Sequence, residues 1–289
     1  MNVRCRYTLP LPHGSSLVLG QRTLLMGVVN VTPDSFSDGG DWNDTRRASD
    51  HAMALVAAGA DLLDIGGEST RPGAAPVSTR EELSRVRPVL ERVIGRVGVP
   101  VSVDTYKADV AQVALDHGAA IINDVSGLLY EPALAEVVAD HRAALILMHN
   151  RGRSLRMHRD AEYGDVAAEV VAELDERITA AVEAGVDRAR IMVDPGVGFA
   201  KRAQHCYTVL AKLGALARLN RPIVVGPSRK SFLADDTGGP QARDWATAAA
   251  VVTSVLNGAH VVRVHNVRDM SQVVAVADRC RAADGDSSS

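Results

Sequence analysis

Eight short apolar runs along the chain are each followed, at their ends or shortly after, by polar side chains that could act on a ligand. In chain order these residues are Asn30, Asp64, Asp104, Asn123, His149, Asp194, Lys230 and the pair Arg263 and His265. Any one of them could simply cap the helix that follows its strand. Taken together, acceptors and cations after eight successive strands indicate a ligand site where the strand ends meet.

The acceptors in this set suit a flat, nitrogen-rich ring. Asp104, Asn123 and Asp194 can all accept hydrogen bonds, and buried carboxylates need matching donors. A ring that presents several N–H groups, such as an aminopyrimidine, would supply them. Lys230 adds a donor for a carbonyl oxygen or a ring nitrogen.

The other members of the set suit an anion. Arg263 and His265 lie two residues apart, so on one strand they point the same way. With the side-chain amide of Asn30 they could form a pocket for an anion or a metal-bound anion. The alternative for Arg263 is an internal ion pair with a carboxylate of the same sheet.

Two long loops, residues 30–40 and 66–78, follow the first two apolar runs. Both are rich in Gly, Pro, Ser, Thr and Asp, which excludes them from the core. Loops of this length in a compact domain are usually lids or binding loops, although a plain surface connection is the alternative. Phe36 and Arg71 favour docking onto a ligand, whereas Asp34 and Asp38 are typical turn formers.

Two further residues near these ends have simpler interpretations. His149 has no second metal ligand at a suitable spacing, which favours a hydrogen-bonded structural histidine. Lys201 could reach an anion, but a solvated loop lysine is the preferred interpretation.

The apolar runs alternate with alanine-rich stretches of helical periodicity, which predicts a (β/α)₈ TIM barrel with its active site at the carboxyl ends of the strands. Runs that are apolar on both faces are typical of buried parallel strands. Gly59, Gly118, Gly185 and Gly258 each end a helix before the next strand. An open doubly wound sheet is the alternative, but no G-x-G-x-x-G follows the first run. The expected strands are 24–29, 61–65, 99–103, 120–122, 144–148, 190–193, 222–225 and 260–264.

Composition limits the kind of protein. A net charge of -3 gives no field that would hold nucleic acid. The three cysteines are far apart and form no CxxC pair, which indicates reduced thiols and a cytoplasmic location. No apolar window approaches the roughly 20 residues of a membrane span. We expect residues 1–23 to be an extension that packs on the barrel, 24–281 to be the barrel, and 282–289 to be a disordered tail.

Seven segments resemble the signature segments of dihydropteroate synthases, in order and with credible spacing. They are MGVVNVTPDSFSDGG (26–40), DIGGESTRPGA (64–74), VSVDTYKADVA (101–111), INDVSG (122–127), DPGVGFAK (194–201), GPSRKSF (226–232) and RVHNV (263–267). The resemblance implies that the chain condenses 6-hydroxymethyl-7,8-dihydropterin diphosphate with p-aminobenzoate. Two residues depart from the family's usual pattern: Asn266 stands where Asp is usual, and Pro227 precedes Ser228.

The resemblance also implies roles for individual residues. It assigns pterin contacts to Asp104, Asn123, Met148, Asp194, Phe199 and Lys230. It assigns p-aminobenzoate contacts to Phe36, Thr70, Arg71, Pro72 and Ser231. It assigns the diphosphate to Asn30, Arg263 and His265, with Mg²⁺ on Asn30. The catalytic groups would be Asp104, Lys230, Arg263 and His265.

The family mechanism lets diphosphate leave first and the aryl amine attack the pterin cation. Diphosphate must be neutralised, the cation stabilised and water excluded. A homodimer is implied, with helices near the C-terminus as the contact. Two alternatives stay open: an inactive paralogue that binds pterin or phosphate, and a pterin-barrel methyltransferase.

Overall fold

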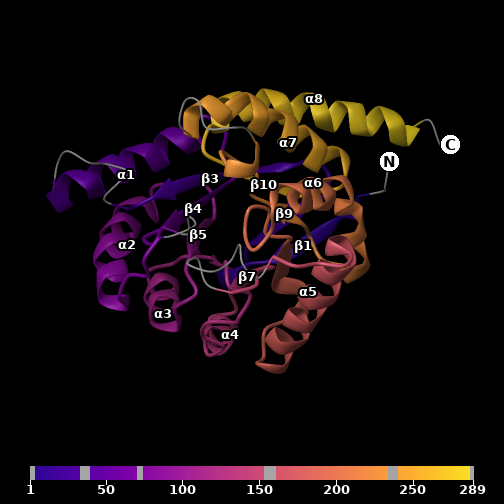
Figure 1. Ribbon diagram of the computed structural model, residues 1–289. Helices are drawn as coiled ribbons and strands as arrows, with labels where there is room; N and C mark the ends of the chain where they lie inside the picture. Colours follow the sequence, from indigo (N-terminus) through magenta and orange to yellow (C-terminus); the bar gives the residue numbers. More distant parts are fainter. Residues whose placement is uncertain (1–3, 33–39, 70–73, 153–160, 234–239, 287–289) are drawn as a thin grey trace.

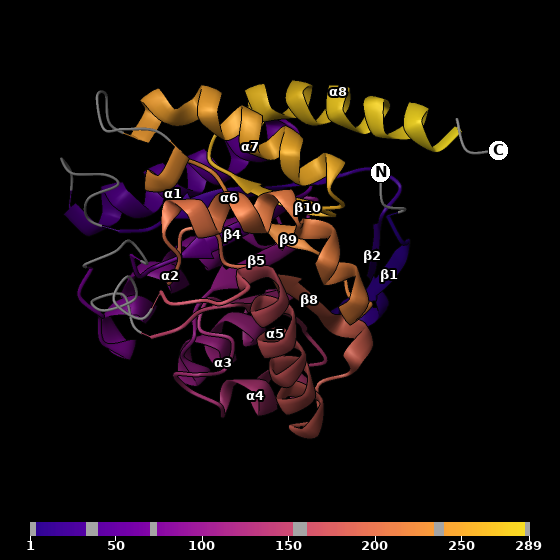
Figure 2. The same cartoon turned by 45° about the vertical axis from the view of Figure 1, so that its right-hand side comes forward.

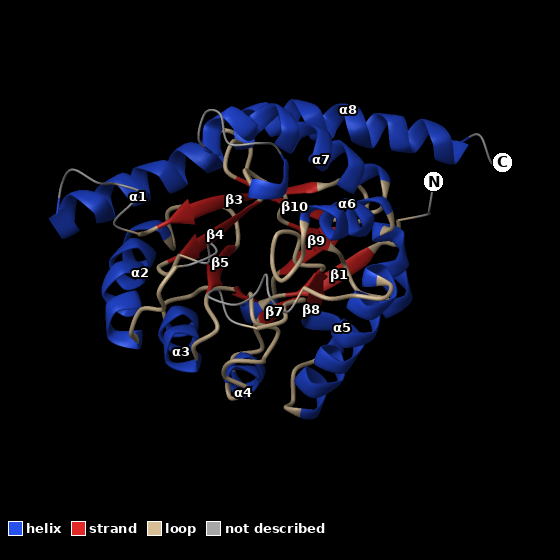
Figure 3. Cartoon of the chain, viewed as in Figure 1, coloured by secondary structure: helices blue, strands red, loops and turns tan. Residues whose placement is uncertain are grey.

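Eight parallel strands enclosed by helices form a barrel in the computed structural model, which describes residues 4–32, 40–69, 74–152, 161–233 and 240–286 (Figure 3). The barrel strands are β3 (Leu24–Asn30), β4 (Leu62–Gly66), β5 (Val101–Asp104), β6 (Ile121–Asp124), β7 (Ala144–Met148), β8 (Ile191–Asp194), β9 (Val224–Val225) and β10 (Val261–Val264). Their spatial order is β8-β7-β6-β5-β4-β3-β10-β9. A parallel bridge between Val193 and Ile223 closes the ring between β8 and β9.

The helices surround this barrel, and successive helices lie side by side (Figure 1). They are α1 (Gly40–Ala57), α2 (Thr79–Val93), α3 (Ala108–Asp116), α4 (Leu134–Asp140), α5 (Val166–Glu183), α6 (Ala203–Ala211), α7 (Asp244–Leu256) and α8 (Val267–Asp286). Short 3₁₀ helices are η1 (Pro12–Gly14), η3 (Arg188–Arg190), η4 (Leu213–Leu219), η5 (Ser231–Leu233) and η6 (Pro240–Arg243). The predicted fold class is confirmed, and the strands differ from their predicted bounds by one or two residues at most ends.

Alternation along each strand separates two kinds of surroundings. On β4, Leu62 faces the barrel interior, whereas Leu63 and Ile65 pack against the helices. Asp64 has the same parity as Leu62, so its carboxylate points inward as well. The strand faces that pack against the helices are therefore apolar, whereas the faces toward the barrel interior also carry polar groups near the carboxyl ends of the strands.

An antiparallel hairpin of β1 (Tyr7–Pro10) and β2 (Ser16–Leu19) covers the opposite end of the barrel (Figure 2). Its side chains Leu9, Leu11 and Leu19 pack with interior residues such as Met26 and Ile146. This apolar cluster seals the amino ends of the strands and leaves the carboxyl ends as the polar face.

The four helix-ending glycines share one backbone conformation. Gly59, Gly118, Gly185 and Gly258 have φ of 101°, 99°, 98° and 106°. Other residues rarely adopt this region, so a glycine is required where each helix turns toward the next strand. The repeated motif in the sequence thus marks a repeated helix end.

The C-terminal helix α8 continues to Asp286, five residues past the point where we placed the end of the barrel. It packs along α7 (Figure 1). Residues 282–286 are therefore helical, and the prediction of a disordered tail from residue 282 is wrong for them. In the part of the chain that the structure describes, no helix is long and apolar enough to cross a membrane.

Candidate active site

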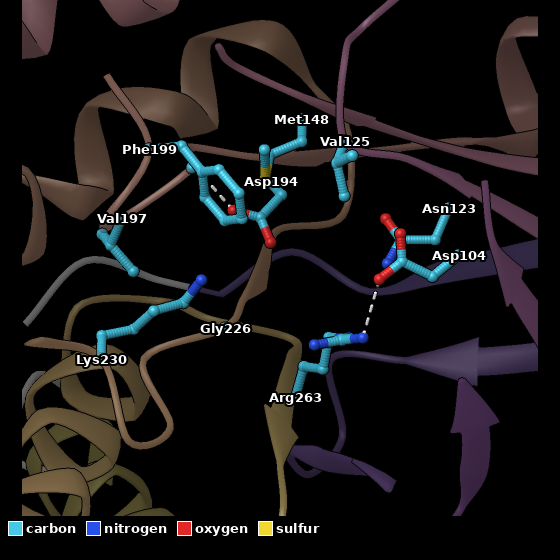
Figure 4. A pocket seen from close by; sticks show the side chains of 11 residues that line it. Asp104, Asn123, Val125, Met148, Asp194, Val197, Phe199, Gly226, Lys230 and Arg263 are labelled. Atoms are coloured by element: carbon cyan, nitrogen blue, oxygen red, sulfur yellow. Dashed lines mark hydrogen bonds and ion pairs between the residues drawn. The ribbon is translucent and has the colours of Figure 1, made fainter. Parts of the chain in front are cut away.

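A cavity lies at the carboxyl ends of the barrel strands (Figure 4). Its lining residues are Asp104, Asn123, Val125, Met148, Asp194, Gly196, Val197, Phe199, Gly226, Lys230 and Arg263. All six residues to which the resemblance assigns pterin contacts are among them, together with Arg263. Asp194 and Arg263 therefore line the same cavity.

Arg263 holds one side of the cavity together. Its Nε donates to Asp64 Oδ2 at 2.6 Å, and its Nη2 donates to Asp104 Oδ2 at 2.9 Å. Asn123 Nδ2 donates to the same Asp64 oxygen at 3.0 Å. The internal ion pair that the sequence left as an alternative for Arg263 is therefore present, and Asp64 belongs to the barrel interior rather than to the cavity lining.

Asp104 and Arg263 form a buried ion pair, and for each of them burial and the charge of the partner shift the pKa in opposite directions. Burial raises the pKa of Asp104 to about 7, although Arg263 lowers it, and the neighbouring Asp64 raises it further. Burial lowers the pKa of Arg263, but Asp64 and Asp104 outweigh that effect, so its pKa is raised overall. Arg263 stays charged, whereas Asp104 can exchange a proton near neutral pH.

Asp194 and Lys230 form the opposite side of the cavity. Asp194 Oδ1 accepts a hydrogen bond from the backbone N–H of Gly196 at 2.7 Å. Lys230 Nζ lies 3.9 Å from the centre of the Phe199 ring, a cation–π distance. Burial raises the pKa of Asp194 to about 6 and lowers that of Lys230 to about 8, so both groups titrate close to neutrality.

The segment after β8 needs glycine at two positions. Gly196 and Gly198 have φ of 67° and 83°. A Cβ on Gly196 would lie 2.0 Å from the carbonyl oxygen of His149, so the backbones approach too closely for any side chain. This tight turn brings the Gly196 N–H onto Asp194 and carries Phe199 to the cavity.

The turn that carries Lys230 is held by its neighbour Arg229, which sequence reasoning missed. Arg229 adopts a φ of 59°, a conformation that non-glycine residues rarely take. Its guanidinium pairs with Asp244 through hydrogen bonds of 2.8 and 3.0 Å, and its N–H donates to Thr247 Oγ1 at 3.0 Å. The ion pair with a residue at the start of α7 could not be read from the local sequence.

Asn266, which stands where the family usually has Asp, contacts the same Asp244 that pairs with Arg229. Its Nδ2 donates to Asp269 Oδ2 at 2.7 Å and to Asp244 Oδ2 at 3.3 Å. An aspartate in this place would face two carboxylates without a proton to donate. The other departure, Pro227, is buried, and its carbonyl accepts from the Lys230 N–H at 3.5 Å.

The other two residues assigned to the diphosphate, Asn30 and His265, lie at the carboxyl ends of β3 and β10 but do not line the cavity. His265 Nδ1 is 2.9 Å from Ser228 Oγ, and its backbone N–H donates to the same oxygen at 3.2 Å. Asn30 is half-buried at the end of β3 and pairs with Gly66 of β4.

Most of the residues assigned to p-aminobenzoate lie outside the part of the chain that the structure describes. Ser231 begins η5 and is exposed, outside the cavity lining. Phe36, Thr70, Arg71 and Pro72 lie outside the described residues. The middle of each predicted lid falls in the same undescribed ranges.

Two neighbours of the cavity differ in how well they were predicted. His149 is a structural histidine, as expected, with Nε2 3.1 Å from Glu173 Oε2. Lys201 is not a solvated loop lysine: its side chain is 2% exposed and its Nζ lies 2.7 Å from His149 Nδ1. The prediction failed because a lone lysine after a glycine-rich turn carries no sign of burial.

Val125, Val197 and Gly226 also line the cavity, and the sequence had not singled them out. Each follows a strand end by one to three residues, which is the one signal that could have found them. Apolar and small residues supply the shape of the cavity, whereas sequence reasoning had selected only groups with hydrogen-bonding capacity.

Comparison with known proteins shows the family to which this sequence and fold belong. Residues 26–265 match the family model described as pterin binding enzyme. A dihydropteroate synthase from Synechocystis is 44% identical over 272 residues, 93% of this chain and 94% of that one. The chain belongs to the dihydropteroate synthase family.

Two solved structures extend this relationship to three dimensions. The dihydropteroate synthase of Xanthomonas albilineans with 4-aminobenzoic acid has a TM-score of 0.87 and 41% identity, and covers 95% of this chain and 99% of its own. The same protein in complex with 7,8-dihydropteroate has a TM-score of 0.83 and 39% identity, over 94% and 99% of the two chains. The family is thus one of transferases of folate biosynthesis.

Proposed function

We propose that the chain condenses 6-hydroxymethyl-7,8-dihydropterin diphosphate with p-aminobenzoate to give 7,8-dihydropteroate and diphosphate. The observation that carries this proposal is that one and the same cavity is lined by the acceptors Asn123 and Asp194 and by the cations Lys230 and Arg263. A flat ring with paired N–H donors and a negatively charged leaving group would find complementary partners in it.

The pterin ring would bind to the acceptor side. Asn123 Nδ2 already donates to Asp64, which turns its carbonyl oxygen toward other donors. Asp194 uses one oxygen for the Gly196 N–H and keeps the other for the ring. Asp104 would meet the remaining ring nitrogens. Phe199 and Met148 supply apolar walls to the cavity.

The leaving diphosphate would be met by Arg263 and His265. Arg263 uses its Nε and one N–H of Nη2 for the two carboxylates, and a guanidinium has five N–H groups in all. The others can meet the charge that develops on the leaving oxygen. Asp104 and Asp194 in turn suit the positive charge that develops on the pterin.

Mg²⁺ is the metal we propose, with Asn30 as its protein ligand. The side-chain oxygen of Asn30 is of the type that Mg²⁺ prefers, and this metal commonly combines few protein ligands with phosphate and water. Bound there, Mg²⁺ would help to neutralise the diphosphate.

The p-aminobenzoate site is proposed between Ser231 and the residues Phe36, Thr70, Arg71 and Pro72. Support comes from the family membership and from the bound ligand of the Xanthomonas albilineans protein, a 4-aminobenzoic acid. An aryl amine needs no dedicated base to attack a cation, so no nucleophile–base pair is required.

We also propose a homodimer in the cytoplasm. Trp245 of α7 is 89% exposed and Val276 of the neighbouring α8 is 58% exposed, and large apolar side chains in water support a contact through these helices. The free state of the three cysteines supports the reducing compartment. Sedimentation at several concentrations tests the dimer, and a monomer at all of them would remove it.

Diphosphate release from the purified chain tests the function. With both substrates and Mg²⁺, we expect diphosphate to appear only when p-aminobenzoate is present, together with dihydropteroate. Pterin binding without turnover would instead indicate an inactive paralogue. Methyl transfer from a methylfolate to a corrinoid protein would indicate the methyltransferase.

A further inference from the structure

Lys201 is a buried cation directly behind the cavity. Its Nζ lies 2.7 Å from His149 Nδ1 and donates to the carbonyl oxygens of Gly196 and Phe199, both at 3.3 Å. These three acceptors match the three N–H groups of an ammonium. Burial lowers the pKa of Lys201 to about 7, so these three acceptors are what favour the charged ammonium against the cost of taking it out of water.

The proton positions follow from the next residue in the network. His149 Nε2 lies 3.1 Å from Glu173 Oε2. Burial raises the pKa of Glu173, but hydrogen bonds from His149 and Arg151 outweigh this and lower it to about 2. The carboxylate can only accept, so His149 carries its proton on Nε2 and presents a lone pair on Nδ1. Lys201 is therefore the donor to His149.

The backbone that Lys201 holds is the backbone that shapes the cavity. The carbonyl of Gly196 accepts a hydrogen bond from Lys201 Nζ, and the N–H of Gly196 donates to Asp194 Oδ1. The carbonyl of Phe199 also accepts from Lys201 Nζ, and the Phe199 ring lies under Lys230 Nζ. The adjoining Ala200 is fixed as well, because its carbonyl accepts from the Tyr163 hydroxyl at 2.9 Å. One lysine side chain thus binds two carbonyls of a short segment from which Gly196, Val197 and Phe199 line the cavity.

We propose that Lys201 is a positioning residue, whose ammonium fixes residues 195–200 in the shape that binds the pterin ring. This deepens the proposed function and rests on it for the identity of the ligand. Lys201 touches no substrate: it acts through the carbonyls of Gly196 and Phe199. Its loss alters the recognition of the pterin and leaves that of p-aminobenzoate unchanged.

The variant Lys201→Met tests this, because methionine is of similar length and carries no charge. The matched control is Lys212→Met at the end of α6, where the side chain is 58% exposed and lies 3.9 Å from Asp165. Calorimetry with oxidised 6-hydroxymethylpterin measures ring binding without the leaving group or turnover. We expect Lys201→Met to weaken this binding by about tenfold or more and the control to change it by less than about twofold.

Steady-state kinetics separates positioning from a general loss of structure. With saturating pterin diphosphate, the KM for p-aminobenzoate of Lys201→Met should stay within about twofold of the parent value. A folded variant with unchanged pterin affinity would overturn the proposal, as would an equal loss of affinity for both substrates. If the parent chain gives no turnover, the proposed function fails, whereas calorimetry still decides the role of Lys201.

A second variant covers the case in which Lys201→Met does not fold. His149→Gln keeps the lysine and removes its imidazole acceptor, so the ammonium loses its closest partner. A pterin affinity weakened by about threefold or more would support the proposal, and an unchanged affinity in the folded variant would overturn it.

Discussion

Asp64 accepts a hydrogen bond from Arg263 Nε at 2.6 Å inside the barrel, where the aspartate side chain is wholly shielded from solvent. The same oxygen accepts from Asn123, while its other oxygen has no partner among the described residues. One carboxylate oxygen thus orients a cation and an amide that lie next to each other on the same side of the cavity. The relative placement of these two groups depends on a residue that the ligand does not reach.

Asp64→Asn should therefore impair both stability and catalysis. The variant leaves Asp104 as the only carboxylate that pairs with Arg263, and Arg263 and Asn123 must share one neutral amide oxygen beside a new NH2 donor. Removing one partner of a buried ion pair lowers the free energy of unfolding by roughly 3 kcal/mol, measured by urea denaturation. We expect kcat/KM for the pterin diphosphate to fall by about 10²-fold. Asp116→Asn, on the surface at the end of α3, serves as the control, and equal values for the two variants would contradict this role.

Arg263→Ala should slow the reaction by about 10²-fold or more, because charge on the leaving diphosphate would lose a preorganised partner. It also leaves Asp64 and Asp104 without their shared cation. Pre-steady-state measurement of diphosphate release separates this from weaker binding. Turnover equal to that of the parent chain would remove Arg263 from the reaction.

Asp194→Asn should weaken pterin binding more than p-aminobenzoate binding. The substitution keeps the size of the side chain but replaces one acceptor oxygen with a donor, which opposes the N–H groups of the ring. We expect a loss of about tenfold or more in pterin affinity by calorimetry. Losses of similar size for both substrates would show that Asp194 does not face the ring.

The pH dependence of kcat/KM for the pterin diphosphate should be bell-shaped. Asp104 and Asp194 must be ionised to accept N–H groups, and their raised pKa values of about 7 and about 6 leave them protonated in acid. The rate therefore rises as pH rises through this range. Lys230 must stay protonated, and its lowered pKa of about 8 makes the rate fall above that pH. A flat profile across this window would contradict the assigned roles.

Much of the architecture was predictable because short-range physics determines it. Apolar runs that were buried on both faces indicated parallel strands, and the four glycines marked helix ends whose positive φ excludes other residues. The hairpin was harder to predict. Its apolar residues, such as Leu9 and Leu19, gain their burial only from the closed amino end of the barrel.

The residues that line the cavity from the pterin side were predictable as single groups, whereas the contacts between them were not. The sequence placed Asp104 and Arg263 at the ends of different strands, but the ion pair between them depends on barrel closure. Lys201 was misjudged for the same reason, since its three acceptors come from residues 149, 196 and 199. Which polar groups neutralise one another is decided by tertiary distances that spacing along the chain does not encode.

A crystal structure of this chain with 6-hydroxymethylpterin and diphosphate tests the central claim most directly. We predict that the aminopyrimidine edge lies within hydrogen-bonding distance of Asp194 and Asn123, with the diphosphate beside Arg263 and His265 in the same cavity. A pterin bound on another surface, or a diphosphate that makes no contact with Arg263, would contradict the account.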